Sequence, residues 1–294
     1  MKFYLLIPLF LLLSCNNAKE KQSLSKLDQE IRKLINKTEG DFALAFRLLD
    51  GGGNGLFLNE KESFHAASTM KTPVMIALFE QEAAGKFSLK DSILIRNSFK
   101  SILDGSLYKM DLGVDSQEAL YKRIGENASL YELMYEMIVR SSNLATNILI
   151  EKVGAANVTQ LMRELGADDI QVLRGVEDLK AYDAGLSNTT TALDMMLIME
   201  AIARHKVAGS QNMMHILSDQ HFNDLIPKYL PKEVKVAHKT GSITGVQHDA
   251  AILELPEGKR YVLVILTKNL ADEEVGKESI ARISQLIYNY VKGL

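Results

Sequence analysis

The chain has 294 residues, of which 47% are hydrophobic and 24% are charged, with only five prolines. This composition supports a large buried core and excludes a disordered, collagen-like or low-complexity protein. The formal charge of −3 supplies no broad basic face for phosphate backbones, so we expect no nucleic-acid partner.

The N-terminal segment has the pattern of a secretory signal, because Lys2 precedes an apolar run too short to span a bilayer. The only cysteine, Cys15, follows this run, and the junction resembles the lipobox of bacterial lipoproteins. One cysteine also excludes a disulfide framework and a thiolate zinc cluster. We therefore predict a signal peptide at 1–14, a lipid on Cys15, and a tether that leads into the first helix at 15–38. A buried or free thiol is the alternative.

Two strands joined by a turn are predicted next. Apolar residues alternate from Phe42 to Leu48, and a glycine-rich break at 51–55 precedes Leu56 and Phe57. A phosphate-binding loop is the alternative for the glycines, but the cluster lacks the following lysine and the G-x-G-x-x-G frame. The hairpin interpretation is the better one.

Helical spacing dominates the middle of the chain, and strand spacing returns near its end. The expected helices lie near 70–84, 130–138 and 193–197. The expected later strands lie at 234–240, 250–255 and 261–267. A closing helix carries Ile280, Ile283, Ile287 and Val291 on one face.

This order of elements predicts an α/β fold of the α+β kind, with one antiparallel sheet built from both ends of the chain. A helical subdomain at about 68–231 is inserted between the sheet-forming parts at about 39–67 and 232–294. Together they form one catalytic domain at 39–294. We expect the cleft where the two parts meet.

Three short motifs occur in order along the chain, at 68–71, 141–143 and 239–241. The first, Ser68-Thr69-Met70-Lys71, has a Ser-x-x-Lys spacing that also occurs at 23–26 and 106–109. Only Ser68 follows a strand-like segment and opens a long apolar helix. The first motif is therefore the best candidate for a reactive serine.

Three residues along a helix would place Lys71 on the same face as Ser68, within reach of its hydroxyl. A serine becomes a nucleophile when a base takes its proton. A lysine that is partly dry and crowded by other cations has a lowered pKa and can be that base. The alternative is a helix-capping serine with a solvated lysine.

The other two motifs suit substrate binding. Ser141-Ser142-Asn143 follows the helix predicted near 130–140. Lys239-Thr240-Gly241 lies on a predicted strand, along which a substrate would gain backbone hydrogen bonds. Lys239 would supply positive potential, Thr240 a hydroxyl for a carboxylate, and Gly241 room for close approach. A surface lysine beside a strand-end turn is the alternative.

Together these motifs resemble the penicillin-recognising serine acyl-transferases, and most closely the class A β-lactamases and related lipoprotein serine hydrolases. The resemblance makes Ser68 the nucleophile and Lys71 its base or proton relay. Ser141 would pass a proton to the leaving nitrogen, and Asn143 would hold the substrate amide. The N–H groups of Ser68 and Ser242 would form the oxyanion hole. No metal or organic cofactor is implied.

The chain departs from this family at two places. Ser142 replaces the usual aspartate of Ser-Asp-Asn, which removes a structural carboxylate. The omega-loop pattern Arg-x-Glu-x-x-Leu-Asn is replaced by Arg174-Gly175-Val176-Glu177-Asp178-Leu179-Lys180, with the glutamate displaced by one residue and a lysine in place of asparagine. Glu177 is the best candidate base for deacylation, against the alternative of a solvated loop carboxylate.

Other kinds of catalytic site fit less well. The chain has no G-x-S-x-G elbow and no H-E-x-x-H helix, and its six histidines show no metal-ligand spacing. His238 and His248 flank the predicted cleft without an assigned role. The segment 98–126 carries no interpretable motif.

We therefore expect a monomeric class A β-lactamase, lipid-anchored in the bacterial cell envelope at Cys15, that opens small-molecule β-lactams through a Ser68 ester. One alternative is a D-Ala-D-Ala carboxypeptidase or transpeptidase acting on acyl-D-Ala-D-Ala peptides. The other is a β-lactam sensor that is acylated and does not turn over.

Overall fold

The computed structural model describes residues 23–50, 55–115 and 117–294. The predicted signal peptide, Cys15, the first part of the tether and the glycine-rich turn at 51–54 lie outside these residues. Within the described ranges, no helix is both long enough and apolar enough to cross a bilayer.

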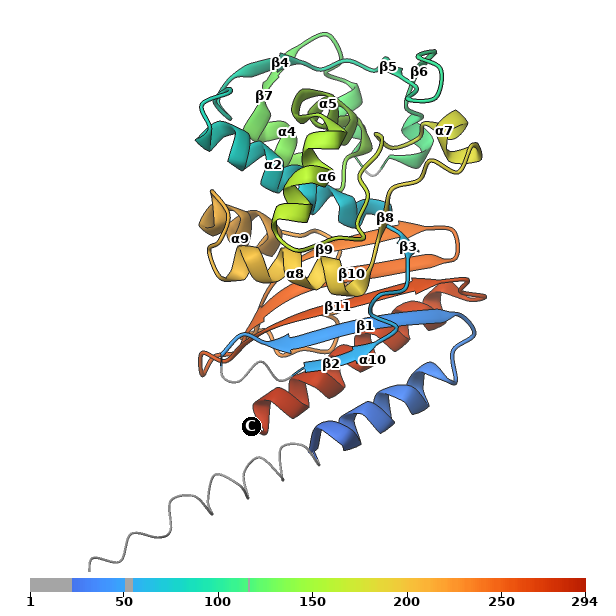
Figure 1. The fold of residues 1–294 in the computed structure, drawn as a ribbon, viewed down its shortest axis with the longest axis vertical. Helices are drawn as coiled ribbons and strands as arrows, with labels where there is room; N and C mark the ends of the chain where they lie inside the picture. The colour runs from blue at the N-terminus through green and yellow to red at the C-terminus, as the bar shows by residue number, and fades with distance from the viewer. Residues whose placement is uncertain (1–22, 51–54, 116) are drawn as a thin grey trace, which may run out of the picture.

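A five-stranded antiparallel sheet with the order β2-β1-β11-β10-β9 forms the centre of the fold (Figure 1). Its strands are β1 (Asp41–Leu48), β2 (Gly55–Leu58), β9 (Lys235–Ile243), β10 (Val246–Glu254) and β11 (Arg260–Lys268). Strand β1 from the N-terminal part pairs with β11 from the C-terminal part, so that Leu44 lies opposite Ile265. The predicted α+β fold, with a sheet built from both ends of the chain, is confirmed.

Strand β10 begins at Val246, four residues earlier than the apolar alternation indicates. The added residues Gln247, His248 and Asp249 are polar and yet buried. Each of them has hydrogen-bond partners inside the fold. The alternation of hydrophobic residues does not detect a strand segment whose buried residues are polar and form their hydrogen bonds inside the fold.

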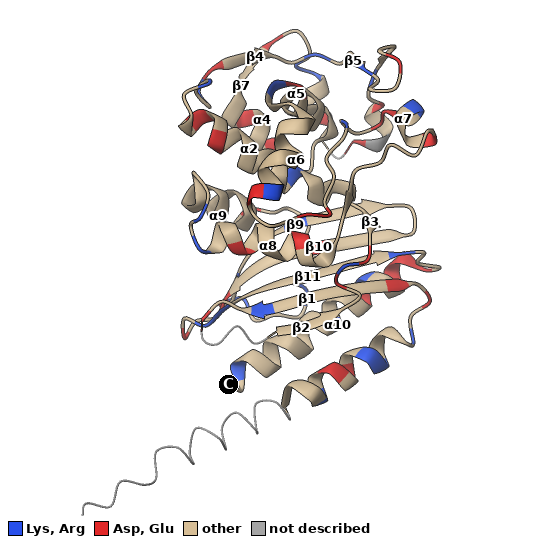
Figure 2. Cartoon of the chain, viewed as in Figure 1, with Lys and Arg blue, Asp and Glu red and all other residues tan. Residues whose placement is uncertain are grey.

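One face of the sheet is covered by α10 (Glu273–Lys292) and by the helix at 23–35 (Figure 1). The four apolar residues predicted for one face of the closing helix are all buried against the sheet. Figure 2 shows that positive and negative residues are interspersed along these two helices. The two helices thus have the amphipathic form of surface helices.

The helical part packs on the other face of the sheet (Figure 1). Its helices are η1 (Ala67–Met70), α2 (Lys71–Ala83), η2 (Leu112–Val114), α3 (Glu118–Tyr121), α4 (Leu130–Val139), α5 (Asn143–Val153), α6 (Ala155–Glu164), α7 (Leu179–Asp183), α8 (Ala192–Ala203) and α9 (Ser210–Ser218). Three short strand pairs complete the part: β3 (Phe64–His65) with β8 (Thr189–Thr190), β4 (Ser92–Leu94) with β7 (Asn127–Ser129), and β5 (Phe99–Lys100) with β6 (Leu107–Tyr108). The helices expected near 70–84, 130–138 and 193–197 are present as α2, α4 and α8.

Tyr261 provides a test of the packing between the sheet and α10. Its ring meets Phe46 edge to face at 5.6 Å, and its buried hydroxyl has no hydrogen-bond partner among the described residues. An unsatisfied buried hydroxyl destabilises the folded state. Tyr261→Phe should therefore leave the free energy of unfolding in urea unchanged or raise it by about 1 kcal/mol. Phe46→Ala, in the same cluster, should lower it by about 3–5 kcal/mol.

A loss of stability in Tyr261→Phe as large as that in Phe46→Ala would contradict this account of the core.

Candidate active site

Ser68 lies in the short η1 turn, between β3 and the start of α2. The residue before it, Ala67, has a φ of 44°, which is unusual for a residue other than glycine. The Ala67 N–H donates to His65 Nδ1 at 3.0 Å, and Thr69 Oγ1 donates to Ala66 O at 2.6 Å. These bonds hold the serine in a tight turn, half-buried.

Gly241 on β9 lies directly against this turn. A Cβ added to Gly241 would lie 3.1 Å from the backbone nitrogen of Ser68 and 3.2 Å from Ala67 Cβ. The glycine therefore permits close packing of β9 on η1, in addition to the approach of a substrate expected from the sequence. This contact brings the backbone of Ser68 close to that of Ser242, the residue after Gly241, and both serines line one cavity.

Lys71 is completely buried, and its ammonium points into the protein. Nζ donates to Ser141 O at 2.6 Å, to Ser141 Oγ at 3.2 Å and to Asn143 Oδ1 at 2.9 Å. Burial lowers the pKa of Lys71 to about 7, against the opposing charges of Asp115 and Glu177. A solvated lysine does not fit this geometry. Desolvation, and not a neighbouring cation, is the main cause of the low pKa.

Ser141 lies between two lysines. Lys239 Nζ donates to Ser141 Oγ at 3.0 Å and to Thr240 O at 2.9 Å, from a position that is also completely buried. Burial and the charge of Lys71 lower the pKa of Lys239 well below its ordinary value. The alternative of a surface lysine on β9 does not fit. Ser141 itself has a φ of 58°, so this link between α4 and α5 is locally strained.

Asp115, from a distant part of the chain, places a carboxylate at the start of α5. Its oxygens accept from Asn143 N at 3.1 Å, Leu144 N at 2.9 Å and Tyr121 Oη at 3.0 Å. These bonds satisfy the first N–H groups of α5 and fix Asn143 beside the site. Asp115 lies in the segment 98–126, in which the sequence offered no motif.

Glu177 is half-buried and lies next to Asn143. Its carboxylate accepts from Asn143 Nδ2 at 3.2 Å and from Asp111 N at 3.1 Å, and burial raises its pKa. Lys180, at the position of the family's asparagine, points away and donates to Asp104 and Ser106 on the surface. Asn143 therefore joins Lys71, through its amide oxygen, to Glu177, through its amide nitrogen.

Asn147 on α5 holds the backbone that leads to Glu177. Its Oδ1 accepts from Val176 N at 2.7 Å, and its Nδ2 donates to Val176 O at 3.0 Å. A Cβ on Gly175 would lie only 2.4 Å from Asn147 Oδ1, so this approach requires glycine. Asn147 carries no signal in the sequence, because an asparagine inside an apolar helix has no distinctive spacing.

A cavity of about 320 Å³ opens at this cluster. The residues that line it are Ser68, Ser141, Asn143, Phe222, Asp224, Leu225, Thr240, Ser242, Gln247 and Lys277. The structure thus brings together the predicted residues from all three motifs. It adds residues from the 222–225 segment, β10 and α10 that the sequence did not indicate.

The two histidines that flank the cleft are buried and have structural partners. His238 Nδ1 lies 2.9 Å from Asp249 Oδ1, and His248 Nε2 donates to His65 O at 2.8 Å. Burial lowers the pKa of His248 to about 4. In the part of the chain that the structure describes, no three His, Cys, Asp or Glu residues are placed to hold a metal ion.

Asp115 provides a test of how α5 is held. In Asp115→Asn the side chain loses its charge and one acceptor oxygen, so an N–H at the start of α5 loses its partner. We expect the free energy of unfolding in urea to fall by about 0.5–2 kcal/mol. Asp111→Asn is the matched control, since the Asp111 side chain is exposed and accepts from Gly113 N in the short η2 turn. Equal losses in both variants would contradict the assignment.

Comparisons with known proteins agree with this geometry. A family model described as the Beta-lactamase enzyme family matches residues 26–291. A β-lactamase of Rhodobacter capsulatus is 33% identical over 240 residues, which are 79% of this chain and 78% of that protein.

Solved structures of similar fold cover nearly the whole chain. The β-lactamase from Sphaerobacter thermophilus has a TM-score of 0.78 and 27% identity, over 90% of this chain and 97% of that one. A variant of PBP-A, solved as an acyl-enzyme complex with penicillin G, has the same TM-score and identity over 92% of this chain and 98% of that one. The resemblance to the β-lactamases that the three motifs predict is confirmed.

Proposed function

Because this chain belongs to the beta-lactamase enzyme family, we propose that it is a serine hydrolase that opens β-lactams through an ester on Ser68. One observation carries the proposal. Two buried lysine ammonium groups converge on the hydroxyl of Ser141, which lines the same cavity as Ser68. Such an arrangement supplies a base, a proton path and positive potential beside one nucleophile.

In acylation, the neutral amine of Lys71 takes the proton of Ser68 as Oγ attacks the lactam carbonyl. The N–H groups of Ser68 and Ser242 stabilise the oxyanion, a contribution of about 3–4 kcal/mol per donor. Ser141 Oγ then gives its own proton to the leaving nitrogen as the C–N bond breaks, and it takes the proton of Lys71, 3.2 Å away, in replacement. Lys239 favours each step in which Ser141 carries negative charge.

Strand β9 binds the substrate in this proposal. It is an edge strand of the sheet, so its outer backbone groups are available to a ligand. The hydroxyl of Thr240 and the potential of Lys239 hold the substrate carboxylate. The amide of Asn143 holds the acyl side chain. The substrate carbonyl is then placed over Ser68.

Glu177 is the base that activates water for deacylation. Its half-buried position and its bonds to Asn143 and Asp111 support this role over that of a solvated loop carboxylate. A carboxylate whose pKa is raised by burial is a stronger base than a solvated one. The rivals are a D-Ala-D-Ala peptidase and a sensor without turnover, both of which share the acylation chemistry.

The location of the protein forms a further part of the proposal. The signal-like run before Cys15 supports a lipid-anchored protein of the bacterial cell envelope. The helix at 23–35 covers the face of the sheet opposite the helical part (Figure 1), so the anchor would join the molecule on that side.

The pH dependence of acylation tests Lys71. The lysine is a base only when neutral, and its pKa of about 7 lies below the ordinary 10.5. The second-order rate of adduct formation with a penicillin should therefore rise with pH, with a midpoint near pH 7. Lys71→Arg stays charged at every pH and should lose this rise together with most of the rate. A midpoint near 10 in the unmodified enzyme would contradict the assignment.

Intact mass followed over time tests Glu177 and separates the three candidate functions. With a penicillin, Glu177→Gln should accumulate an acyl-enzyme and lose about 10²- to 10⁴-fold in turnover, the range expected for removal of a general base. Glu164→Gln, a control at an exposed position on α6, should turn over normally. Ser68→Ala should form no adduct.

The unmodified chain decides among the functions. Steady hydrolysis of the lactam supports a β-lactamase. Turnover of a D-Ala-D-Ala peptide supports the peptidase, and a stoichiometric long-lived adduct without either turnover supports the sensor.

A further inference from the structure

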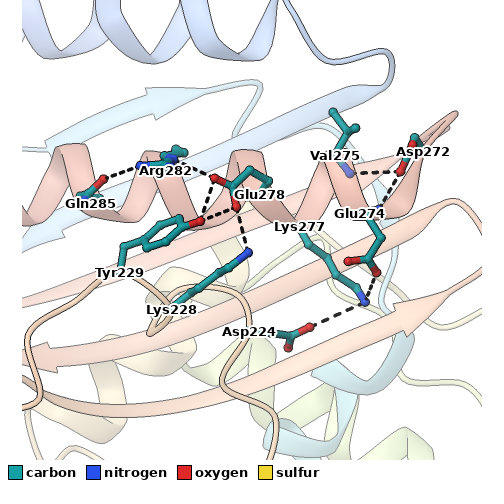
Figure 3. Close-up of polar contacts among 10 residues, drawn as sticks. All are labelled: Asp224, Lys228, Tyr229, Asp272, Glu274, Val275, Lys277, Glu278, Arg282 and Gln285. Carbon is teal, nitrogen blue, oxygen red and sulfur yellow. Dashed lines mark hydrogen bonds and ion pairs between the residues drawn. The ribbon is translucent and has the colours of Figure 1, made fainter.

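A charged pair is among the residues that line the cavity. Asp224 from the loop before β9 and Lys277 from α10 both line it. Lys277 Nζ lies 2.8 Å from Glu274 Oε1 but 3.7 Å from Asp224 Oδ2 (Figure 3). Lys277 is thus held mainly by its own helix. The Asp224 carboxylate, whose side chain is 57% exposed, keeps much of its capacity to bind another cation.

The backbone around Asp224 is fixed on both sides. Asn223 Oδ1 lies 3.3 Å from His238 Nε2, and Ile226 N donates to Asp249 Oδ2 at 3.1 Å. Farther along, Lys228 and Tyr229 both donate to Glu278 of α10 (Figure 3). A carboxylate on a segment that hydrogen bonds already hold in place binds a ligand with little loss of conformational entropy.

The proposed acylation geometry identifies the part of a substrate that would reach Asp224. With the carbonyl at Ser68, the lactam nitrogen near Ser141 and the carboxylate at Thr240, substituents of the leaving-group ring extend past Thr240 and Ser242. Phe222 and Asp224 line the same cavity as Thr240 and Ser242.

We propose that Asp224 forms a subsite for a cationic substituent on the leaving-group ring of a β-lactam. This inference rests on the proposed function and names a preferred substrate class within it. The cation pairs with Asp224, Lys277 stays paired with Glu274, and the apolar side chain of Phe222 contacts the body of the substituent. Because the pair is partly exposed, its effect on rate is modest, about two- to fivefold.

The test compares two cephalosporins that share one acyl group. One carries a neutral acetoxymethyl group on the leaving-group ring, and the other carries a pyridinium-methyl group on the same carbon. The second-order rate of acylation is measured for each at low ionic strength, by intact mass and by hydrolysis. Asp224→Asn should lower the rate for the cationic compound about two- to fivefold and leave the neutral compound unchanged. Added salt should reduce the difference.

Asp219→Asn is the matched control. It removes an equal charge five residues away, where the carboxylate accepts from Tyr135 Oη outside the cavity lining. The control should leave the ratio of the two rates unchanged. An unchanged ratio in Asp224→Asn, or an equal loss with both compounds, overturns the subsite and leaves the proposed function standing. An unmodified chain that forms an adduct with neither compound overturns both.

Discussion

The site depends on the burial of two lysine amines around one hydroxyl. Lys71 and Lys239 both donate to Ser141 Oγ, and neither side chain is exposed to solvent. Burial removes both amines from water and so lowers the free energy cost of losing a proton, and the charge of Lys71 lowers the pKa of Lys239 further. The unfavourable burial thus produces a lysine that is a base near neutral pH. The same group in solvent would be protonated and without catalytic use.

This unfavourable arrangement is held in place by favourable contacts on several elements. Gly241 lets β9 press against the turn that carries Ser68, and Asp115 fixes the start of α5 beside Asn143. Ala67, which precedes the nucleophile, and Ser141 and Glu177 within the site all have positive φ values, so strained backbone is present where the proposed chemistry takes place. Such strain persists only where surrounding structure determines it, and here the sheet and the helical part supply that support.

Sequence reasoning found the parts of this site that are encoded locally. Ser68 and Lys71 lie three residues apart at the start of an apolar helix, and Lys239 lies on a predicted strand. Spacing together with this local context was sufficient to select them. The central sheet and the main helices followed from hydrophobic periodicity in the same way. Each of these features depends on neighbours in the chain.

The residues that sequence reasoning missed contact partners that are far from them along the chain. Asp115 reaches Asn143 across 28 residues, and Asn147 reaches Val176 across 29. Lys277 joins the cavity only because α10 packs on the sheet beside the loop of Asp224. A single sequence does not show which distant aspartate binds the start of a helix, because exposed and buried carboxylates have the same local sequence pattern. Such partners become visible only when the fold places them together.

The displaced glutamate shows how these long-range contacts compensate for a local departure. In this chain Glu177 is one residue out of the family's spacing, yet Asn147 holds the backbone before it and Asn143 holds its carboxylate. Because the Asn143 oxygen accepts from Lys71 while its nitrogen donates to Glu177, a flip of this amide would break both bonds. The charge on Glu177 in turn raises the pKa of Lys71. The proposed bases for acylation and deacylation are therefore joined by one amide, and the protonation of each affects the pKa of the other. The position of the Glu177 carboxylate thus depends on this hydrogen-bond network and not on the residue's spacing in the omega-loop motif.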